Sequence, residues 1–158
     1  MTDENTEASI RAYFAERVPH DWFSASPSVE SDSEEILCVG VLPPGTSVDE
    51  FRERTRRARM AVASEAERLF GRSVSWGVEV VGTTTLFTTQ NTPVMTRLRL
   101  RQRRVLDTLI DAGVARSRSE ALAWCVKLVE RHEGEWLAEL REALVGVAEV
   151  RTEGPTLL

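Results

Sequence analysis

The chain has 158 residues, of which 42% are hydrophobic and 28% are charged, and its net charge is −5. These values are typical of a soluble globular protein with one domain or two small ones. No apolar stretch approaches the roughly 18 residues that cross a bilayer, and the acidic first residues do not resemble a signal peptide, so we expect a cytoplasmic protein without a membrane partner.

Residues 1–35 are predicted to form a short helix followed by an acidic loop. Ile10 and Phe14 recur at helical spacing within residues 7–18. The loop after this helix is rich in Ser, Pro and acidic residues. Trp22 and Phe23 are its obvious anchors to a core.

Residues 36–92 are predicted to form a small α/β domain with the element order β-α-β-β, and the sequence assigns it no role. The apolar run of residues 36–42 has the length of a buried strand. Two further strands are predicted over Val74–Val81 and Thr83–Thr89. Residues 90–93 are expected to be a hinge between the two halves of the chain.

The helix of this domain is predicted over Val48–Phe70. Ser47 and Glu50 have the spacing of a capping box at its start. Its predicted buried face consists of Phe51, Ala58, Val62, Ala66 and Leu69. It also carries a basic cluster, Arg52, Arg54, Arg56, Arg57 and Arg59. Because several acidic residues share this helix, we interpret the cluster as a solvated, salt-bridged face, with a DNA or protein contact as the alternative.

Side chains of two kinds alternate strictly from Val94 to Arg101. One face of the predicted strand carries Val94, Thr96, Leu98 and Leu100, and the other carries Met95, Arg97, Arg99 and Arg101. No nearby segment offers a partner strand, which would leave backbone hydrogen bonds unmade. The same strand of a second chain can pair with it antiparallel. The pattern therefore predicts a homodimer joined by a two-stranded ribbon.

Three helices are predicted after this strand. The first covers residues 102–112 and ends at Gly113, and the second begins at a capping box formed by Ser117 and Glu120. The second helix is apolar nearly all the way round and needs cover on more than one side, which an intertwined dimer provides. A last helix is expected over residues 135–150, before a loose tail.

Positive charge is concentrated in the same region. Residues 97–118 contain seven arginines and only two acidic residues, a net charge of +5 that leaves −10 for the rest of the chain. A two-stranded ribbon fits the major groove of DNA, where arginine can contact guanine with two hydrogen bonds. The start of the helix after Ser117 offers backbone N–H groups to a phosphate. The negative net charge therefore does not exclude DNA.

The stretch TRLRLRQRRVLDTLIDAGVARSRSEALAWCV, residues 96–126, resembles the ribbon-helix-helix fold of the Arc, MetJ and CopG repressors. It has the alternating strand, the LDTLIDAG helix, the glycine turn and the RSRSEA opening of the second helix in the same order. The first helical turn departs from the family because it carries arginines, which leaves the strand-to-helix junction open by one residue. The resemblance implies that the base-reading residues are Arg97, Arg99 and Arg101. It also implies a phosphate anchor at Ser117, Arg118 and Ser119, which Arg116 and Arg118 flank with positive charge.

The sequence predicts no metal, cofactor or catalytic site. His20, His132, Cys38 and Cys125 are too scattered to have ligand spacing, and the two cysteines lie in apolar runs typical of reduced, buried thiols. The chain contains no glycine-rich phosphate loop, nucleophile elbow, HExxH motif or paired-carboxylate motif.

We therefore predict an α+β protein with the α/β domain, a ribbon-helix-helix module over residues 93–132 and an extra carboxy-terminal helix within residues 133–158. The leading hypothesis is a homodimeric, sequence-specific transcription repressor that binds double-stranded DNA. Further oligomerisation on DNA stays open, and the amino-terminal domain would take a protein or small-molecule effector. The alternatives are an autoregulating antitoxin, a structural protein that uses the ribbon only to dimerise and, last, an enzyme housed in residues 36–90.

Overall fold

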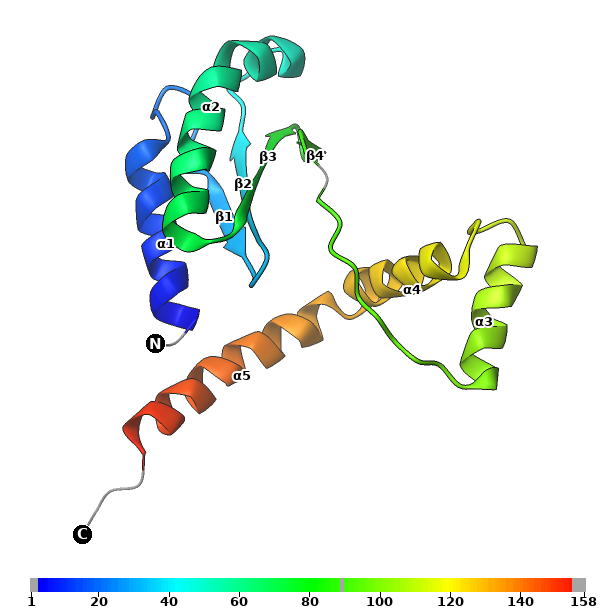
Figure 1. Ribbon diagram of the computed structural model, residues 1–158. Coiled ribbons are helices and arrows are strands. Elements are labelled where there is room, and N and C mark those ends of the chain that lie inside the picture. Colours follow the sequence, from blue (N-terminus) through cyan, green and yellow to red (C-terminus); the bar gives the residue numbers. More distant parts are fainter. Residues whose placement is uncertain (1–2, 89, 155–158) are drawn as a thin grey trace. The chain divides into compact units, whose positions relative to one another are not determined.

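The computed structural model describes residues 3–88 and 90–154 (Figure 1). The chain divides into two compact units, Met1–Val94 and Met95–Leu158. The predicted hinge at residues 90–93 directly precedes this division. The amino-terminal helix and the acidic loop, which the sequence suggested as a separate segment, belong to the first unit together with the α/β domain.

The first unit is a four-stranded mixed sheet with two helices on one face (Figure 1). The strand order is β1-β2-β3-β4; the middle pair is parallel and the two outer pairs are antiparallel. The helix between β2 and β3 makes the crossover that a parallel pair requires. The elements are α1 (Asp3–Arg17), β1 (Ser28–Ser31), β2 (Glu35–Val41), α2 (Val48–Phe70), β3 (Ser73–Val80) and β4 (Thr83–Leu86).

The predicted β-α-β-β order is confirmed, and the bounds of α2 are those predicted. The Ser47 hydroxyl caps α2 by accepting the Glu50 N–H at 3.5 Å. At the other end Gly71 has a φ of +67°, which ends the helix in a left-handed turn. The last predicted strand ends at Leu86, and its predicted final residue, Thr89, lies outside the described residues.

Strand β1 lies where the sequence predicted only a loop. Val29 pairs with Cys38 of β2, and the turn between the two strands is held by Asp32, whose carboxylate accepts the N–H groups of Glu34 and Glu35 at 2.8 Å each. The loop prediction was wrong here because the strand is four residues long and has a single apolar side chain, so the alternation that marks a strand is hardly visible.

The core of the first unit lies between the sheet and its two helices. Alternate residues of β2 and β3 point into it, and the rings of Phe14, Trp22 and Trp76 meet there at centroid distances of about 6 Å. Trp22 and Phe23 are both buried, so the prediction that they anchor the loop to a core is confirmed. Their packing explains the glycine at position 40, since a Cβ there would lie 2.3 Å from the Phe23 ring.

The buried face of α2 differs from the predicted one. Ala58 and Leu69, which were assigned to it, are exposed. Thr55 and Arg59 are buried instead, so the buried stripe runs through Phe51, Thr55, Arg59, Val62 and Ala66. The prediction was wrong because it passed over polar residues that stand at the correct helical spacing.

The basic cluster of α2 is solvated as predicted at Arg52, Arg54, Arg56 and Arg57, which are exposed, but it departs from the prediction at Arg59 and in its salt bridges. Arg59 is only 6% exposed. No arginine of α2 forms an ion pair within 4.0 Å with another residue in the described part of the chain. The acidic residues of this helix therefore form no salt bridges with its arginines among the described residues.

The second unit consists of three helices, α3 (Leu100–Asp111), α4 (Arg118–His132) and α5 (Gly134–Glu153). All three were predicted. Gly113, with a φ of +77°, makes the turn between α3 and α4. The last helix extends to Glu153, into the tail that was predicted to be loose; residues 155–158 of that tail lie outside the described residues.

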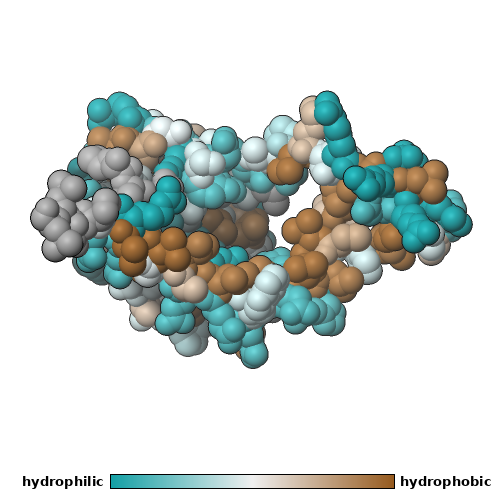
Figure 2. Space-filling model, turned by 90° about the horizontal axis from the view of Figure 1, so that it is seen from below, coloured by the Kyte–Doolittle hydropathy of each residue, from teal (hydrophilic) through white to brown (hydrophobic). Residues whose placement is uncertain are grey.

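The buried core of the second unit is very small. It consists of Leu106, Ala115 and Ala121, with four half-buried apolar residues around them: Leu98, Leu109, Leu122 and Cys125. Many large apolar side chains of the helices are exposed, among them Val105, Val126, Val129, Trp136, Leu140 and Leu144. Figure 2 shows exposed apolar side chains of the molecule as brown areas on the face in view. Within the described residues, no helix combines the length and hydropathy that crossing a bilayer requires.

Candidate nucleic-acid interface

The segment before α3 is the centre of the predicted interface. Residues 90–98 lie outside any helix or strand, and residues 90–97 form no backbone hydrogen bond with another described residue. Met95 is 93% exposed and Arg97 is exposed as well, whereas Leu98 is half-buried against the small core of the second unit. From Arg97 to Arg99 the exposure follows the predicted alternation, whereas Val94 and Thr96, which were predicted on the same face as Leu98, are exposed in the single chain.

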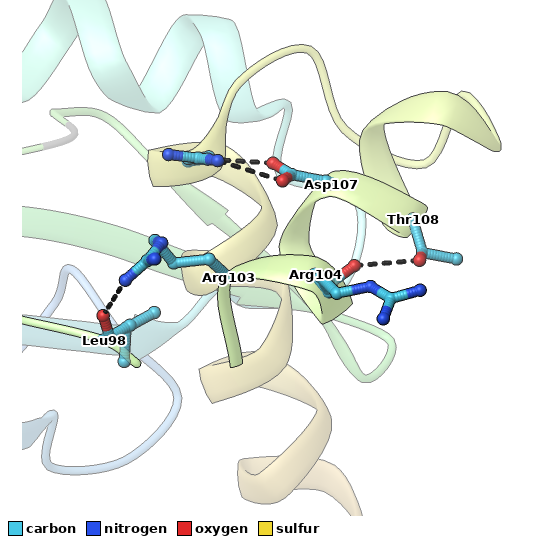
Figure 3. A network of polar contacts seen from close by, with 6 residues as sticks. Leu98, Arg103, Arg104, Asp107 and Thr108 are labelled. Atoms are coloured by element: carbon cyan, nitrogen blue, oxygen red, sulfur yellow. Dashed lines mark hydrogen bonds and ion pairs between the residues drawn. The ribbon is translucent and has the colours of Figure 1, made fainter. Parts of the chain in front are cut away.

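Helix α3 begins at Leu100, two residues earlier than predicted, and Arg99 is the capping residue before it. The Arg99 backbone is extended, with φ −78° and ψ 167°, and its N–H donates to Oε1 of Gln102 at 2.8 Å. Arg103 reinforces this start because its guanidinium donates to the Leu98 carbonyl at 2.6 Å (Figure 3). These two contacts satisfy backbone groups at the helix entry, where the chain has no helical partner for them.

Arg101 therefore does not belong to the extended segment. It lies in the first turn of α3, and Leu100, which was predicted to face inward on a strand, is helical and 61% exposed. The strand prediction over residues 100–101 was wrong. The alternation of apolar residues and arginines continues to Arg101, but the helix already begins at Leu100, where the side chains of Gln102 and Arg103 bond the preceding backbone. Residues 94–99 form no strand in the single chain either, so the ribbon stays a prediction; Arg97 and Arg99 are exposed, as expected of its outward face.

The predicted phosphate anchor lies at the start of α4. The Ser117 hydroxyl accepts the N–H of Glu120 at 3.2 Å, as a capping residue does. The Glu120 carboxylate accepts the N–H of Arg116 at 2.7 Å. The N–H groups of Arg118 and Ser119 have no acceptor within residues 3–88 and 90–154. Two amides at a positive helix end remain for an anion.

The side chain of Arg118 is engaged elsewhere. Its guanidinium donates two hydrogen bonds to the Asp107 carboxylate, at 2.8 and 2.9 Å, and so joins α4 to α3; Figure 3 shows both bonds at Asp107. These hydrogen bonds lower the pKa of Asp107 and raise the pKa of Arg118. The Arg118 guanidinium is therefore engaged within the chain, whereas the guanidinium of Arg116 is exposed.

Sequence reasoning missed the residues that hold this surface in place. Gln102, Arg103 and Asp107 set the entry of α3 and the α3–α4 contact. Gln102 stands three residues after Arg99, the spacing at which a glutamine can accept the N–H at a helix start. The sequence contained this signal, whereas the pairing of Asp107 with Arg118 spans 11 residues and depends on the glycine turn.

Comparison with known proteins finds two family models. Residues 8–86 match the Rv1265-like protein N-terminal domain, and residues 99–151 match the Mb1296 C-terminal domain. Over 157 aligned residues the chain is 52% identical to uncharacterized protein Rv1265 of Mycobacterium tuberculosis and to uncharacterized protein Mb1296 of Mycobacterium bovis. Each alignment covers 92% of this chain and 70% of the relative. The chain belongs to the Rv1265-like family. No solved structure matches it.

The two matches to the Rv1265-like family follow the division of the structure. The first lies inside the Met1–Val94 unit and the second inside the Met95–Leu158 unit. Residues 87–98, which include the exposed segment with Arg97, lie between the two family models. The second model begins at Arg99 and thus covers α3, α4 and most of α5.

Proposed function

We propose that this chain is a homodimeric transcription regulator that reads operator DNA with an antiparallel ribbon formed by residues 94–98 of two copies. The observation that carries the proposal is the extended segment, which has exposed arginines and unpaired backbone groups and leads directly into a helix pair with an undersized core. A two-stranded ribbon would satisfy the backbone groups, and an intertwined dimer would cover the helices. Such a regulator acts in the cytoplasm, at the nucleoid.

The base-reading residues would be Arg97 on this ribbon and Arg99 at its junction with α3. Arginine is suited to the task because its guanidinium donates in parallel to O6 and N7 of guanine. Arg101 was grouped with them on the sequence, but its position on α3 removes it from the outward face of the ribbon. The exposed Arg116 side chain and the free N–H groups of Arg118 and Ser119 would hold the DNA backbone and fix the register.

The hydrogen bonds of the single chain limit which residues can pair in the ribbon, and within that limit we propose a register centred on Thr96. In an extended strand, the backbone groups of successive residues point to opposite sides. The Leu98 carbonyl and the Arg99 N–H point to opposite sides of the chain and are both bonded within it, so pairing with the partner falls to the residues before them. Pairing Met95 with Arg97 of the second copy, and the reverse, places Thr96 opposite its own counterpart on the dimer axis.

This register predicts that Thr96→Cys crosslinks the dimer. Thr96 would form a non-hydrogen-bonded pair, whose Cα atoms lie about 4.5 Å apart and within the range of a disulfide. In a Cys125→Ser background, mild oxidation should give a covalent dimer on a non-reducing gel. Cys38 should not interfere, because it is fully buried and burial raises its pKa to about 12.

Arg97→Cys in the same background is the matched control. Its counterpart in the partner is not directly opposite in this register, so crosslinking should be much weaker. Equal crosslinking of both variants, or none for Thr96→Cys, would contradict the register.

The experiment that tests the function is selection of bound sequences from a random duplex DNA pool by the full chain. A dimer with two equivalent ribbon strands should enrich a site with approximate two-fold symmetry, because the symmetry of the site follows that of the protein. A pool that shows no enriched sequence after several rounds would count against a sequence-specific regulator.

A further inference from the structure

Arg59 is a buried cation with no carboxylate partner among residues 3–88 and 90–154. It lies on the buried stripe of α2 and is 6% exposed. Its Nε donates to the Thr55 hydroxyl at 3.0 Å, and one Nη donates to the Arg52 carbonyl at 2.8 Å. Both acceptors are neutral. The other three N–H donors of this guanidinium have no acceptor among the described residues, although Nη1 is not one of the buried, unsatisfied side-chain atoms found there.

The surroundings of Arg59 add positive charge. The guanidinium carbons of Arg59 and Arg52 lie 4.7 and 5.5 Å from the centroid of the same ring, that of Phe87. Arg56 stands between them on the helix, and burial together with the charges of Arg52 and Arg56 lowers the pKa of Arg59. The carboxylate of Glu53 acts in the opposite direction, with less effect than either arginine.

This arrangement costs free energy in the isolated chain. A buried charge is expected to have a counter-ion, because removing it from water is costly and contact with an aromatic ring offsets that cost only in part. Here two like charges lie nearby, and no ion pair relieves them among the described residues. An external anion at this place would supply the missing counter-charge.

We infer that Arg52 and Arg59, which lie at the Phe87 ring, form a binding site for a phosphoryl group together with Arg56. Positions i, i+4 and i+7 put the three arginines on one face of α2. The planar guanidinium matches the oxygen geometry of a phosphate, and a phosphate has enough oxygens to bond more than one arginine, whereas a carboxylate has two. The site lies in the first unit and does not depend on the proposed ribbon.

A phosphoryl group has two sources, a small phosphorylated compound or the backbone of a nucleic acid. For the first, inorganic phosphate and tripolyphosphate are titrated into the full chain at constant ionic strength and followed by calorimetry. For the second, a DNA duplex is titrated at one fixed salt concentration and followed by fluorescence anisotropy. Binding of phosphate or tripolyphosphate in the first arm identifies a small-molecule site. DNA binding that is weakened by replacing Arg52 and Arg56, without binding in the first arm, identifies nucleic acid.

The decisive comparison is between two double variants of the same helix. Arg52→Gln with Arg56→Gln removes two exposed charges of the site, and Arg54→Gln with Arg57→Gln removes two exposed charges beside it. We expect the first pair to weaken binding in one arm about tenfold or more, since charged hydrogen bonds are lost. The second pair should stay within about twofold, because only long-range attraction is lost. Equal losses in both variants, or no loss in either arm, would overturn the proposal.

Arg59→Met separates binding from packing. Methionine fills similar space without a charge, so the melting temperature without ligand should stay the same or rise. The rise in melting temperature that tripolyphosphate gives to the natural chain should be lost, or, if nucleic acid is the source, the rise that DNA gives should become smaller. A variant that melts much lower and binds as before would show that Arg59 only packs against Phe87, and the site would be wrong.

Discussion

Raising the salt concentration from 50 to 200 mM should weaken DNA binding by a factor of about 10³–10⁵. This range applies if the dimer neutralises six to ten phosphates, because each neutralised phosphate releases condensed counterions. The measurement is fluorescence anisotropy with a selected duplex at several NaCl concentrations, from which the slope of log K against log salt is obtained. A flat response would mean that the arginines of the ribbon do not face the duplex.

Arg116→Ala provides an internal check on that slope. Each dimer contains two copies of this exposed side chain beside the start of α4. If each neutralises one phosphate, the slope should become shallower by about 2, and binding should weaken similarly on every sequence. A change in sequence preference would instead place Arg116 against the bases.

Replacing Arg97 and Arg99 together by Ala should reduce specific affinity about 100-fold or more while the chain stays dimeric. Each arginine that bonds a guanine bidentately contributes roughly 1–3 kcal/mol of discrimination, and the dimer presents each residue twice. Both side chains are exposed, so the fold of the single chain should not suffer. Anisotropy with specific and scrambled duplexes measures the affinity, and light scattering measures the mass.

The matched control is Arg141→Ala with Arg151→Ala, two exposed arginines of α5. It removes the same charge from the same unit and should cost far less specific affinity. If both double variants bind the selected duplex as tightly as the natural chain, the ribbon does not read DNA. The structural hypothesis, in which residues 94–98 only join two copies, would then take its place.

The elements with strong local signals could be predicted from the sequence. Helix α2 was predicted with its observed bounds, because Ser47 caps one end and Gly71 closes the other. Strand β1 could not be predicted, since its single apolar residue, Val29, gains its place only by pairing with Cys38. The burial of Arg59 was missed for a similar reason: a charged residue on a buried stripe is recognised only when its neighbours, Thr55 and Phe87, are seen around it.

The candidate site shows the same division between local and long-range signals. The exposure of Arg97 and Arg99 followed from alternation, and the cap at Ser117 followed from its spacing to Glu120. The helical position of Arg101 depends on two contacts at the helix entry that alternation does not reveal. The role of Arg118 depends on Asp107, which is close only after the chain has turned back at Gly113.

The weak packing of helix α5 determines which part of the second unit unfolds first. None of its residues is buried, and its contacts to the rest of the unit are with α4. A single helix in water owes most of its stability to packing, so α5 should unfold locally at a lower free-energy cost than the α3–α4 pair. Proteases attack such segments first. A cut in α5 would remove the carboxy-terminal end and leave Leu106, Ala115 and Ala121 packed together.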